Sequence, residues 1–193
     1  MDTEERGSTL VETLGVIAIL FVVSSGVWKV ISSGMNRYRM SQAVSQLQSL
    51  QKNIVRRYAA AGNYNALSGG NILEEFHKDK LLPAQMAYAN GKAYHTFGGE
   101  ITVNVGQIVG WGESSYSFKI TYKNLTAPQC AEMASISWVG NDFANIVSIQ
   151  VGTSKFEWPS SSSSDSDNVL PLTRAKASSV CAGGSKDVIW EFR

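Results

Sequence analysis

Few side chains in this sequence are of the kinds that perform catalysis. Its two histidines are His77, which falls in a predicted helix beside Lys78, and His95, which falls in a predicted loop. None of the HExxH, CxxC, GxSxG or P-loop patterns occurs in the chain. Histidines at such places are usually surface or packing residues, so we expect no enzymatic activity and no cofactor.

Two short motifs in predicted loops are of types that bind ions or carry modifications. Asp165 and Asp167 form a D-x-D pattern that could offer oxygen ligands to Ca²⁺, but no further acids lie nearby in the sequence. A solvated loop is the favoured interpretation, and we expect no metal. The segment Asn124-Leu125-Thr126 fits a glycosylation sequon, a motif short enough to arise often by chance.

Glu12 is a carboxylate that requires either solvent or a positively charged partner. It is the only charged side chain in residues 7–28, which read GSTLVETLGVIAILFVVSSGVW. This stretch has the length of a membrane-spanning helix, which takes about 20 apolar residues. Because an ionised carboxylate is costly in hydrocarbon, Glu12 either lies in the solvated interface or pairs with a positive charge in an assembled state.

A secretory signal peptide is an alternative for this stretch, because small residues follow the apolar run. Such a peptide begins with a positively charged region. Residues 1–6, MDTEER, instead contain three acids and one arginine. The acidic start and the internal Glu12 therefore argue against a signal peptide.

The apolar stretch continues into a helix with one apolar face. Between Met40 and Tyr58 the apolar side chains recur in steps of three and four. No proline interrupts residues 8–61, and Gly62 is a good C-terminal stop, so we predict one continuous helix. The plainest interpretation is a single-pass anchor with a helical stalk. Two segments weaken the helix locally, since glycine costs about 1 kcal/mol relative to alanine; they are Ser24-Ser25-Gly26 and Ser32-Ser33-Gly34.

Beyond residue 62 the pattern changes to short strands and helices. Alternating apolar and polar residues predict strands at 100–105, 115–122 and 147–151, and 188–192 (VIWEF) is a final strand candidate. We predict a short helix at 72–82 and a loop at 93–99, and a capping box at Thr126–Gln129 that begins a helix to about Trp138. The sum is an α+β fold with a long N-terminal helix packed on an antiparallel β-sheet head.

The overall composition excludes several classes of protein. The chain has 193 residues, which is one ordinary domain or one domain with an appendage. Its 17 Lys+Arg and 16 Asp+Glu give a net charge of +1, so we expect no nucleic acid as partner. A hydrophobic content of 44% excludes a disordered chain, and a mean hydropathy of -0.09 excludes a polytopic membrane protein.

The N-terminal features together resemble a type IV prepilin. They are a short charged leader, then Gly7, then an acid five residues after that glycine, then an apolar helix; the run TLVETLGVIAIL resembles the family's TLIEL-type run. The resemblance implies that a membrane peptidase cuts between Gly7 and Ser8 and methylates the new N-terminus, although Ser8 stands where the family usually has Phe, Met, Leu or Trp. It also implies that Glu12 pairs with the Ser8 amine of a neighbouring subunit during filament assembly.

The rest of the chain resembles type IVb pilins, and within them the PilS-type pilins of conjugative and thin pili. GNYNALSGGN, YHTFGGEITV, the Pro-Gln-Cys helix start and the ending VIWEF carry this likeness. It implies a leader at 1–7, a pilin helix at 8–61 with 8–28 as transmembrane segment or filament core, and a globular head at 62–193. In pilins a mid-helix segment loses helical order on entering the filament, and we place that segment at one of the two Ser-Ser-Gly breaks.

The sequence contains two cysteines, Cys130 and Cys181. An exported chain of this kind reaches compartments where disulfides persist. We therefore expect the two to form a disulfide that bounds region 130–181, and two buried free thiols are the alternative. The serine-rich tract at 160–167 lies inside this region and is expected to be an exposed loop.

These expectations describe a structural subunit rather than an enzyme. The leading hypothesis is the major pilin of a bacterial type IVb pilus, which polymerises through its N-terminal helix for cell–cell contact, adhesion or conjugation. The expected partners are copies of the chain itself, the prepilin peptidase, and the assembly platform, ATPase and outer-membrane secretin. The precursor is expected in the inner membrane and the pilus outside the cell. A minor pilin or type II secretion pseudopilin is the alternative, followed by a signal-anchored periplasmic binding protein or enzyme.

Overall fold

The structure is a computed structural model that describes residues 4–69, 72–106, 116–136, 145–158 and 168–193. Within the first helix it describes the side chains of residues 12–22 and 34–58. The chain divides into two compact units, Met1–Arg39 and Met40–Arg193, and the boundary lies inside that helix. The predicted serine tract, with Asp165 and Asp167, lies outside the described residues.

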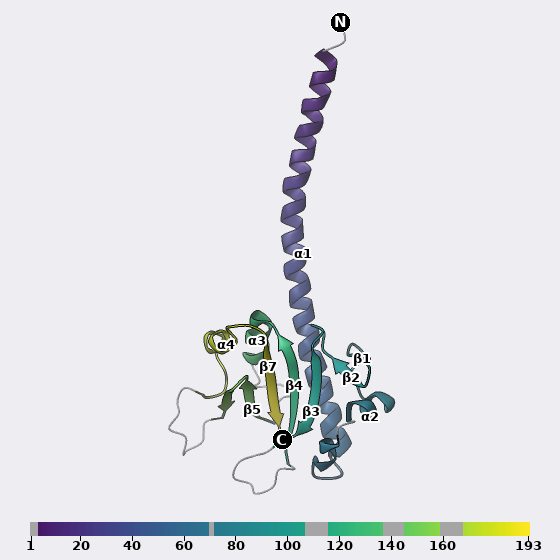
Figure 1. Ribbon diagram of the computed structural model, residues 1–193, viewed down its shortest axis with the longest axis vertical. Helices are drawn as coiled ribbons and strands as arrows, with labels where there is room; N and C mark the ends of the chain where they lie inside the picture. The colour runs from purple at the N-terminus through teal and green to yellow at the C-terminus, as the bar shows by residue number, and fades with distance from the viewer. Residues whose placement is uncertain (1–3, 70–71, 107–115, 137–144, 159–167) are drawn as a thin grey trace. The chain divides into compact units, whose positions relative to one another are not determined.

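The long helix α1 (Glu4–Tyr58) is continuous, as predicted (Figure 1). It begins at Glu4 rather than residue 8 and ends at Tyr58 rather than residue 61. Gly62 terminates it in the left-handed region, with φ +65°, and its N–H donates to the Tyr58 carbonyl at 3.2 Å. Glycine adopts this conformation without a Cβ penalty, which explains the predicted stop.

Among the described side chains, no helix carries an apolar stretch long enough to cross a membrane. The predicted transmembrane segment 8–28 is only partly included in that finding, because the side chains of residues 8–11 and 23–28 are not described.

The second unit contains a seven-stranded antiparallel sheet in the order β1-β2-β3-β4-β7-β5-β6. The last strand of the sequence, β7, therefore lies in the interior of the sheet between β4 and β5 (Figure 1). The strands are β1 (Ala87–Ala89), β2 (Lys92–Tyr94), β3 (Glu100–Val105), β4 (Phe118–Leu125), β5 (Ile146–Val151), β6 (Ser154–Glu157) and β7 (Lys186–Phe192).

Short helices flank the sheet. They are η1 (Asn65–Ser68), α2 (Ile72–Lys78), α3 (Ala127–Ala134) and α4 (Arg174–Val180). Helix α2 packs against β2 and β3, whereas α3 packs against β5 and β7 and also against α4. The capping box that begins α3 is confirmed, because the Thr126 and Gln129 side chains bond reciprocally to each other's backbone N–H groups.

One cluster of buried side chains joins the last turns of α1 to the sheet. Leu47, Leu50 and Ile54 of α1 are fully buried in the same cluster as Tyr122 and Trp190 of the strands. The predicted apolar face of the helix is therefore confirmed, and so is the α+β class with an antiparallel sheet.

Several predicted boundaries were wrong for local reasons. The helix predicted at 72–82 ends at Lys78, because Lys80 adopts φ 55° and the Leu81 N–H donates back to the Phe76 carbonyl at 2.8 Å. This is the hydrogen bond of a Schellman C-cap, which closes a helix before any proline is reached. Helix α3 likewise ends at Ala134 rather than near Trp138, which lies outside the described residues.

The β1–β2 hairpin was missed by the strand prediction. Residues 93–94, predicted as loop, belong to β2, which pairs with β1 across Asn90 and Gly91. Both turn residues have positive φ, 52° and 76°. An Asn-Gly pair is a strong signal for a two-residue hairpin turn, so the sequence did contain the information.

Candidate functional site

The residues of the predicted processing site lie near the start of α1. Gly7 and Ser8 both have helical backbone, and their side chains are not described. Glu12, one turn further along, is exposed and lines a shallow hollow of about 400 Å³ with Thr13, Val16 and Ile17. The carboxylate thus lies next to apolar side chains of its own helix. Its predicted pairing with a neighbouring Ser8 amine requires a second chain and stays a prediction.

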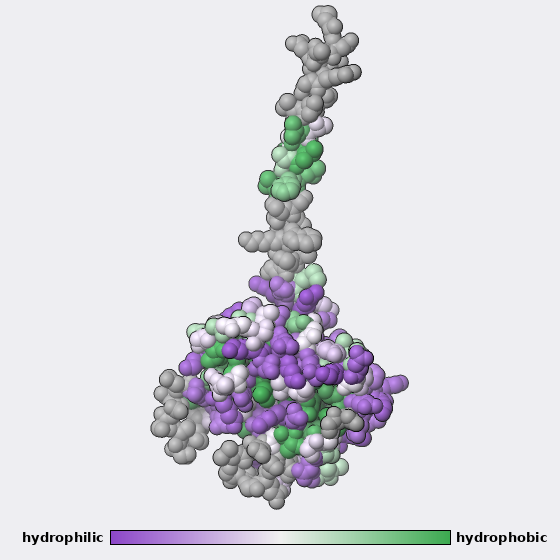
Figure 2. All heavy atoms as spheres, in the orientation of Figure 1, coloured by the Kyte–Doolittle hydropathy of each residue, from purple (hydrophilic) through white to green (hydrophobic). Residues whose placement is uncertain are grey.

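The described part of α1 around Glu12 exposes many large apolar side chains (Figure 2). The exposed fractions range from 53% for Val16 to 78% for Phe21. The others are Leu14, Ile17, Ile19, Leu20 and Val22. Burying one such side chain contributes about 1.5–3 kcal/mol. Residues 14–22 thus form an apolar segment that is exposed on all sides of the helix. Such a surface marks a contact with another apolar surface.

The two weak segments of the helix are helical in the structure. Ser24, Ser25, Gly26, Ser32, Ser33 and Gly34 all lie inside α1. A Cβ at Gly34 would meet no atom within 4 Å, so the glycine there is not required by close packing in the single chain. The predicted loss of helical order concerns the assembled filament and stays a prediction.

The predicted disulfide is confirmed, and it joins two helices that are separated in the chain by β5 and β6. Cys130 in α3 bonds to Cys181, the C-cap of α4, with the Cα atoms 5.8 Å apart. Both residues are fully buried. Because Lys186 begins β7 only a few residues after Cys181, the bond fixes the entry into that interior strand as well as the contact between α3 and α4.

The two histidines have different surroundings. His77 is exposed on α2 and stacks on Tyr88 of β1, with ring centroids 4.0 Å apart. His95 follows β2 and is only 3% exposed. Its Nε2 lies 2.9 Å from the Lys123 carbonyl, and its ring stacks on Tyr122 with centroids 4.9 Å apart. Burial lowers the pKa of His95, and the bond to the Lys123 carbonyl opposes that effect only in part.

A buried carboxylate on β7 was not anticipated from the sequence. Glu191 is 1% exposed and accepts hydrogen bonds from the hydroxyls of Ser117, at 2.8 Å, and Ser148, at 3.1 Å. The Lys119 Nζ lies 4.0 Å from Oε2, the oxygen that accepts from Ser148. The sequence VIWEF predicted a strand, but nothing local showed that a serine just before β4 and a serine of β5 would enclose Glu191.

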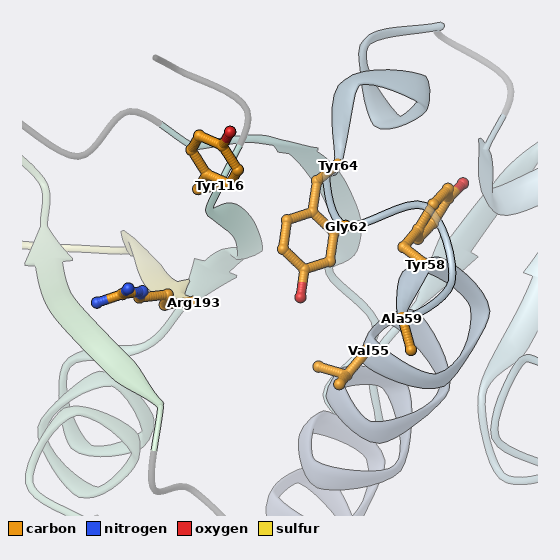
Figure 3. A pocket seen from close by; sticks show the side chains of 7 residues that line it. All are labelled: Val55, Tyr58, Ala59, Gly62, Tyr64, Tyr116 and Arg193. Carbon is orange, nitrogen blue, oxygen red and sulfur yellow. The ribbon is translucent and has the colours of Figure 1, made fainter. Parts of the chain in front are cut away.

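A cavity of about 470 Å³ lies at the C-terminal end of α1 (Figure 3). Figure 3 shows Tyr64 in its middle, between Arg193 and Tyr116 on one side and the last turns of α1 on the other. Burial raises the pKa of Tyr64 and also that of Tyr58, where Glu75 adds to the effect and Arg57 opposes it, so both phenols stay protonated. The lining residues are Val55, Tyr58, Ala59, Gly62, Tyr64, Tyr116 and Arg193.

The described residues offer no metal centre, since no three His, Cys, Asp or Glu side chains among them come together. Asn124 of the sequon is exposed at a bulge in β4, with φ 60°, and its N–H donates to Asp187 at 3.0 Å. Leu125 is fully buried and Thr126 caps α3, so the bulge and the cap account for this segment structurally.

Comparison with known proteins covers most of the chain. A family model described as PilS N terminal matches residues 37–192. The toxin coregulated pilin of Vibrio cholerae is 26% identical over 144 residues, which are 75% of this chain and 62% of that protein. The same pilin from Vibrio cholerae serotype O1 is 26% identical over 141 residues, or 73% of this chain and 61% of that protein. The chain thus spans about three fifths of the length of these relatives.

Two solved structures share the fold of the head. The type IV b pilin from Salmonella typhi has a TM-score of 0.56 at 15% identity, covering 78% of this chain and 96% of that one. TcpA, a type IV pilin from Vibrio cholerae El Tor biotype, has a TM-score of 0.55 at 16% identity, covering 81% of this chain and 99% of that one. At these identities the likeness is evidence for the fold.

Proposed function

The chain belongs to the PilS family of type IV pilins, and we propose that it is the major subunit of a type IVb pilus. Members of this family are structural subunits, so the protein is not an enzyme. The observation that carries the proposal is the exposed apolar segment of α1 from Leu14 to Val22, with Glu12 just before it. In the pilus this segment packs against the same segment of neighbouring copies and is removed from water.

Glu12 has a specific role in this assembly. We infer that cleavage after Gly7 frees the amine of Ser8, which is then a positive group close in sequence to the apolar segment. In the filament core the Glu12 carboxylate of one subunit pairs with the Ser8 amine of its neighbour. A carboxylate surrounded by apolar side chains is strongly penalised when unpaired, so the pairing favours the one axial register in which both charges are neutralised.

Three segments of the chain have different roles in assembly. Residues 1–7 form the leader, residues 8–61 the pilin helix, and residues 62–193 the head. Before assembly the helix holds the precursor in the inner membrane through residues 8–28, where the prepilin peptidase cleaves and methylates it. The assembly platform, ATPase and outer-membrane secretin then pass the growing fibre out of the cell, and one of the two Ser-Ser-Gly breaks loses its helical order.

The head is suited to the outside of such a fibre. Its disulfide closes region 130–181 and stabilises the head without any contact from another subunit. Without residues 1–7, which hold three acids and one arginine, the subunit keeps a small net charge of +3. A small charge suits subunits that repeat along a fibre, because subunits with a large charge of one sign repel each other. We propose contact between cells, either adhesion or conjugation, as the role of the assembled pilus.

The decisive experiment changes Glu12 to Gln in cells that carry the complete assembly system. The variant keeps the size and removes the charge, so we expect a processed subunit that accumulates in the membrane with few fibres. Fibres are counted by electron microscopy, and sheared and cell-bound subunit are compared by immunoblot. Glu75→Gln, at an exposed carboxylate of the head, is the matched control and should assemble normally.

Normal fibre yield from Glu12→Gln would overturn the assignment of Glu12 to the filament core. Absence of long fibres from cells that express the unaltered chain at a high level would instead support a minor pilin or a secretion pseudopilin.

A further inference from the structure

The turn between β2 and β3 contains His95, a buried histidine. The surroundings of this side chain oppose its protonation. The turn covers residues 95–99, where the His95 N–H donates to the Gly99 carbonyl at 3.0 Å and the Gly98 N–H donates to the His95 carbonyl at 2.7 Å. A Cβ on Gly99 would collide with the Lys123 carbonyl and with the imidazole itself. The backbone is therefore packed directly against the His95 ring.

Both ring nitrogens of His95 are engaged in a way that only the neutral imidazole satisfies. Nε2 lies 2.9 Å from the Lys123 carbonyl, so it carries the proton and donates. Nδ1 lies 3.2 Å from the Phe97 backbone nitrogen, so it accepts from that N–H. Protonating Nδ1 would place two donors face to face in a site where the ring is only 3% exposed to water.

The charges around this histidine do not compensate for its protonation. The charged side chains of the strands next to this turn include those of Lys123 on β4, Lys92 on β2 and Glu100 on β3. Glu100 is already shared by the two lysines, at 3.2 Å from Lys123 and 3.4 Å from Lys92. The rings of Tyr122 and Phe97 lie against His95 and are uncharged, so they offer no negative charge to a protonated imidazole. Burial lowers the pKa of His95, and the bond to the Lys123 carbonyl opposes that effect only in part.

The same turn also forms hydrogen bonds with α1. The Gln46 Oε1 accepts from the Thr96 hydroxyl at 2.9 Å and from the Thr96 N–H at 3.2 Å. The Gln46 Nε2 donates to the Gln85 carbonyl at 2.7 Å, just before β1. Gln46 is fully buried, so these bonds are sheltered from water and depend on the position of the turn.

We propose that His95, Thr96 and Gln46 form an acid-released latch between the β2–β3 turn and α1. With neutral His95 the turn is closed and presents Thr96 to Gln46. Protonation of His95 breaks its bond with the Phe97 N–H, opens the turn and weakens the contact between Thr96 and Gln46. The latch acts within a single head and does not require that the chain forms a pilus.

The sign of the effect follows from linkage. A histidine with a lowered pKa binds fewer protons when folded than when unfolded, so the latch is fully closed above the unfolded value near 6.5. It loosens as the pH falls below that value and through the folded pKa.

Hydrogen exchange on the full chain in a mild detergent tests the proposal. Between about pH 7.5 and about pH 5, after correction for intrinsic rates, we expect the amides of Thr96, Phe97 and Gly98 to lose protection by about threefold or more. The amide of Gly152, in the β5–β6 turn, is the internal control and should not change. His95→Gln keeps a neutral donor and acceptor at this position and should abolish the pH dependence. An unchanged pH dependence in His95→Gln, or none in the unaltered chain, would overturn the latch.

Imidazole ¹⁵N spectra give a second measurement that needs no substitution at His95. The chain has two histidines, so exposed His77 serves as the reference for the buried ring. We expect His95 as the Nε2–H tautomer, with a pKa below the ordinary value of 6.5. Because coupling is reciprocal, Gln46→Met should raise the pKa of His95 toward the ordinary value, whereas Gln48→Met should leave it unchanged. An unchanged His95 pKa in Gln46→Met would show that the turn is not linked to α1.

Discussion

Gln46 of α1 and Thr96 of the β2–β3 turn are joined by two hydrogen bonds to one oxygen, across a sequence separation of 50 residues. The same side chain donates to the carbonyl of Gln85. A single buried amide therefore satisfies polar groups of two chain segments that lie on either side of the β1–β2 hairpin. The helix is attached to the sheet by directional bonds as well as by the apolar contacts of Leu47 and Leu50.

Replacing Gln46 with Met should destabilise the head by about 1–3 kcal/mol, because Thr96 and Gln85 lose a partner in a buried site. Urea unfolding of the full chain, followed by tryptophan fluorescence, measures the loss. Gln48→Met is the control, since Gln48 is partly exposed and should change the free energy of unfolding by less than about 0.5 kcal/mol. Equal effects of the two variants would contradict the role of Gln46.

Removing the disulfide with Cys130→Ser and Cys181→Ser together should cost about 4 kcal/mol, the chain-entropy value for a loop of this length. The same loss should follow treatment of the unaltered chain with a reductant, as measured by the midpoint of urea unfolding. The double variant should no longer respond to the reductant. A midpoint that is the same with and without the bond would mean that α3 and α4 hold region 130–181 without it.

Gly106 should tolerate no side chain. A Cβ at this position would collide with the Ser117 hydroxyl and the Glu191 carboxylate, which hydrogen bond to each other. Gly106→Ala should therefore lower the free energy of unfolding by about 1–3 kcal/mol through overpacking of the buried cluster. Gly69→Ala, where the nearest atom would be 3.8 Å away, is the control and should melt close to the unaltered chain in a thermal scan.

Glu100 should produce a second pH dependence, separate from that of His95. Burial works against its charge, but hydrogen bonds from Lys123 and Lys92 outweigh burial and lower its pKa below 4.5. The stabilisation is present above that unfolded value and is lost as the pH falls through the folded pKa, and for these partly exposed pairs it is at most about 1 kcal/mol. In Glu100→Gln the free energy of unfolding should depend less on pH in this acid range, while its dependence on the titration of His95 remains.

The mature N-terminus should be Ser8. Intact-mass and N-terminal peptide mass spectrometry of the exported protein measures this directly, and an added methyl group on Ser8 should appear in the same peptide. Exported chains that begin well beyond Gly26 would point to an ordinary secreted protein and would contradict the proposed leader.

The elements that the sequence predicted well are those with local causes. The periodic apolar face of α1, the stop at Gly62 and the capping box at Thr126 all depend on residues within a few positions of each other. The strand at 100–105 matches β3, which has the same bounds. The strand predicted at 115–122 is instead Phe118–Leu125, because a bulge at Asn124 extends it and Tyr116 lies before its pairing with β7 begins.

The elements that the sequence did not reveal depend on distant partners. Strand β6 and helix α4 are short, and the interior position of β7 is set by its pairing with β4 and β5. From the sequence pattern alone, Gln46, His95 and Glu191 would be assigned to the surface because they are polar. Each is buried because a partner from another segment satisfies it, and burial of a polar group is tolerable only then.

The sequence alone therefore determined that a long helix begins with an apolar run containing Glu12 and continues with one apolar face toward an α+β head. These features follow from periodicity, caps and turn residues, which act over a few positions. Only the tertiary structure decided the strand order, the enclosure of Glu191 and the contact between the β2–β3 turn and α1. Those features depend on contacts between residues far apart in the sequence. Such contacts form only when the intervening loop is closed, so no short segment of sequence reveals them.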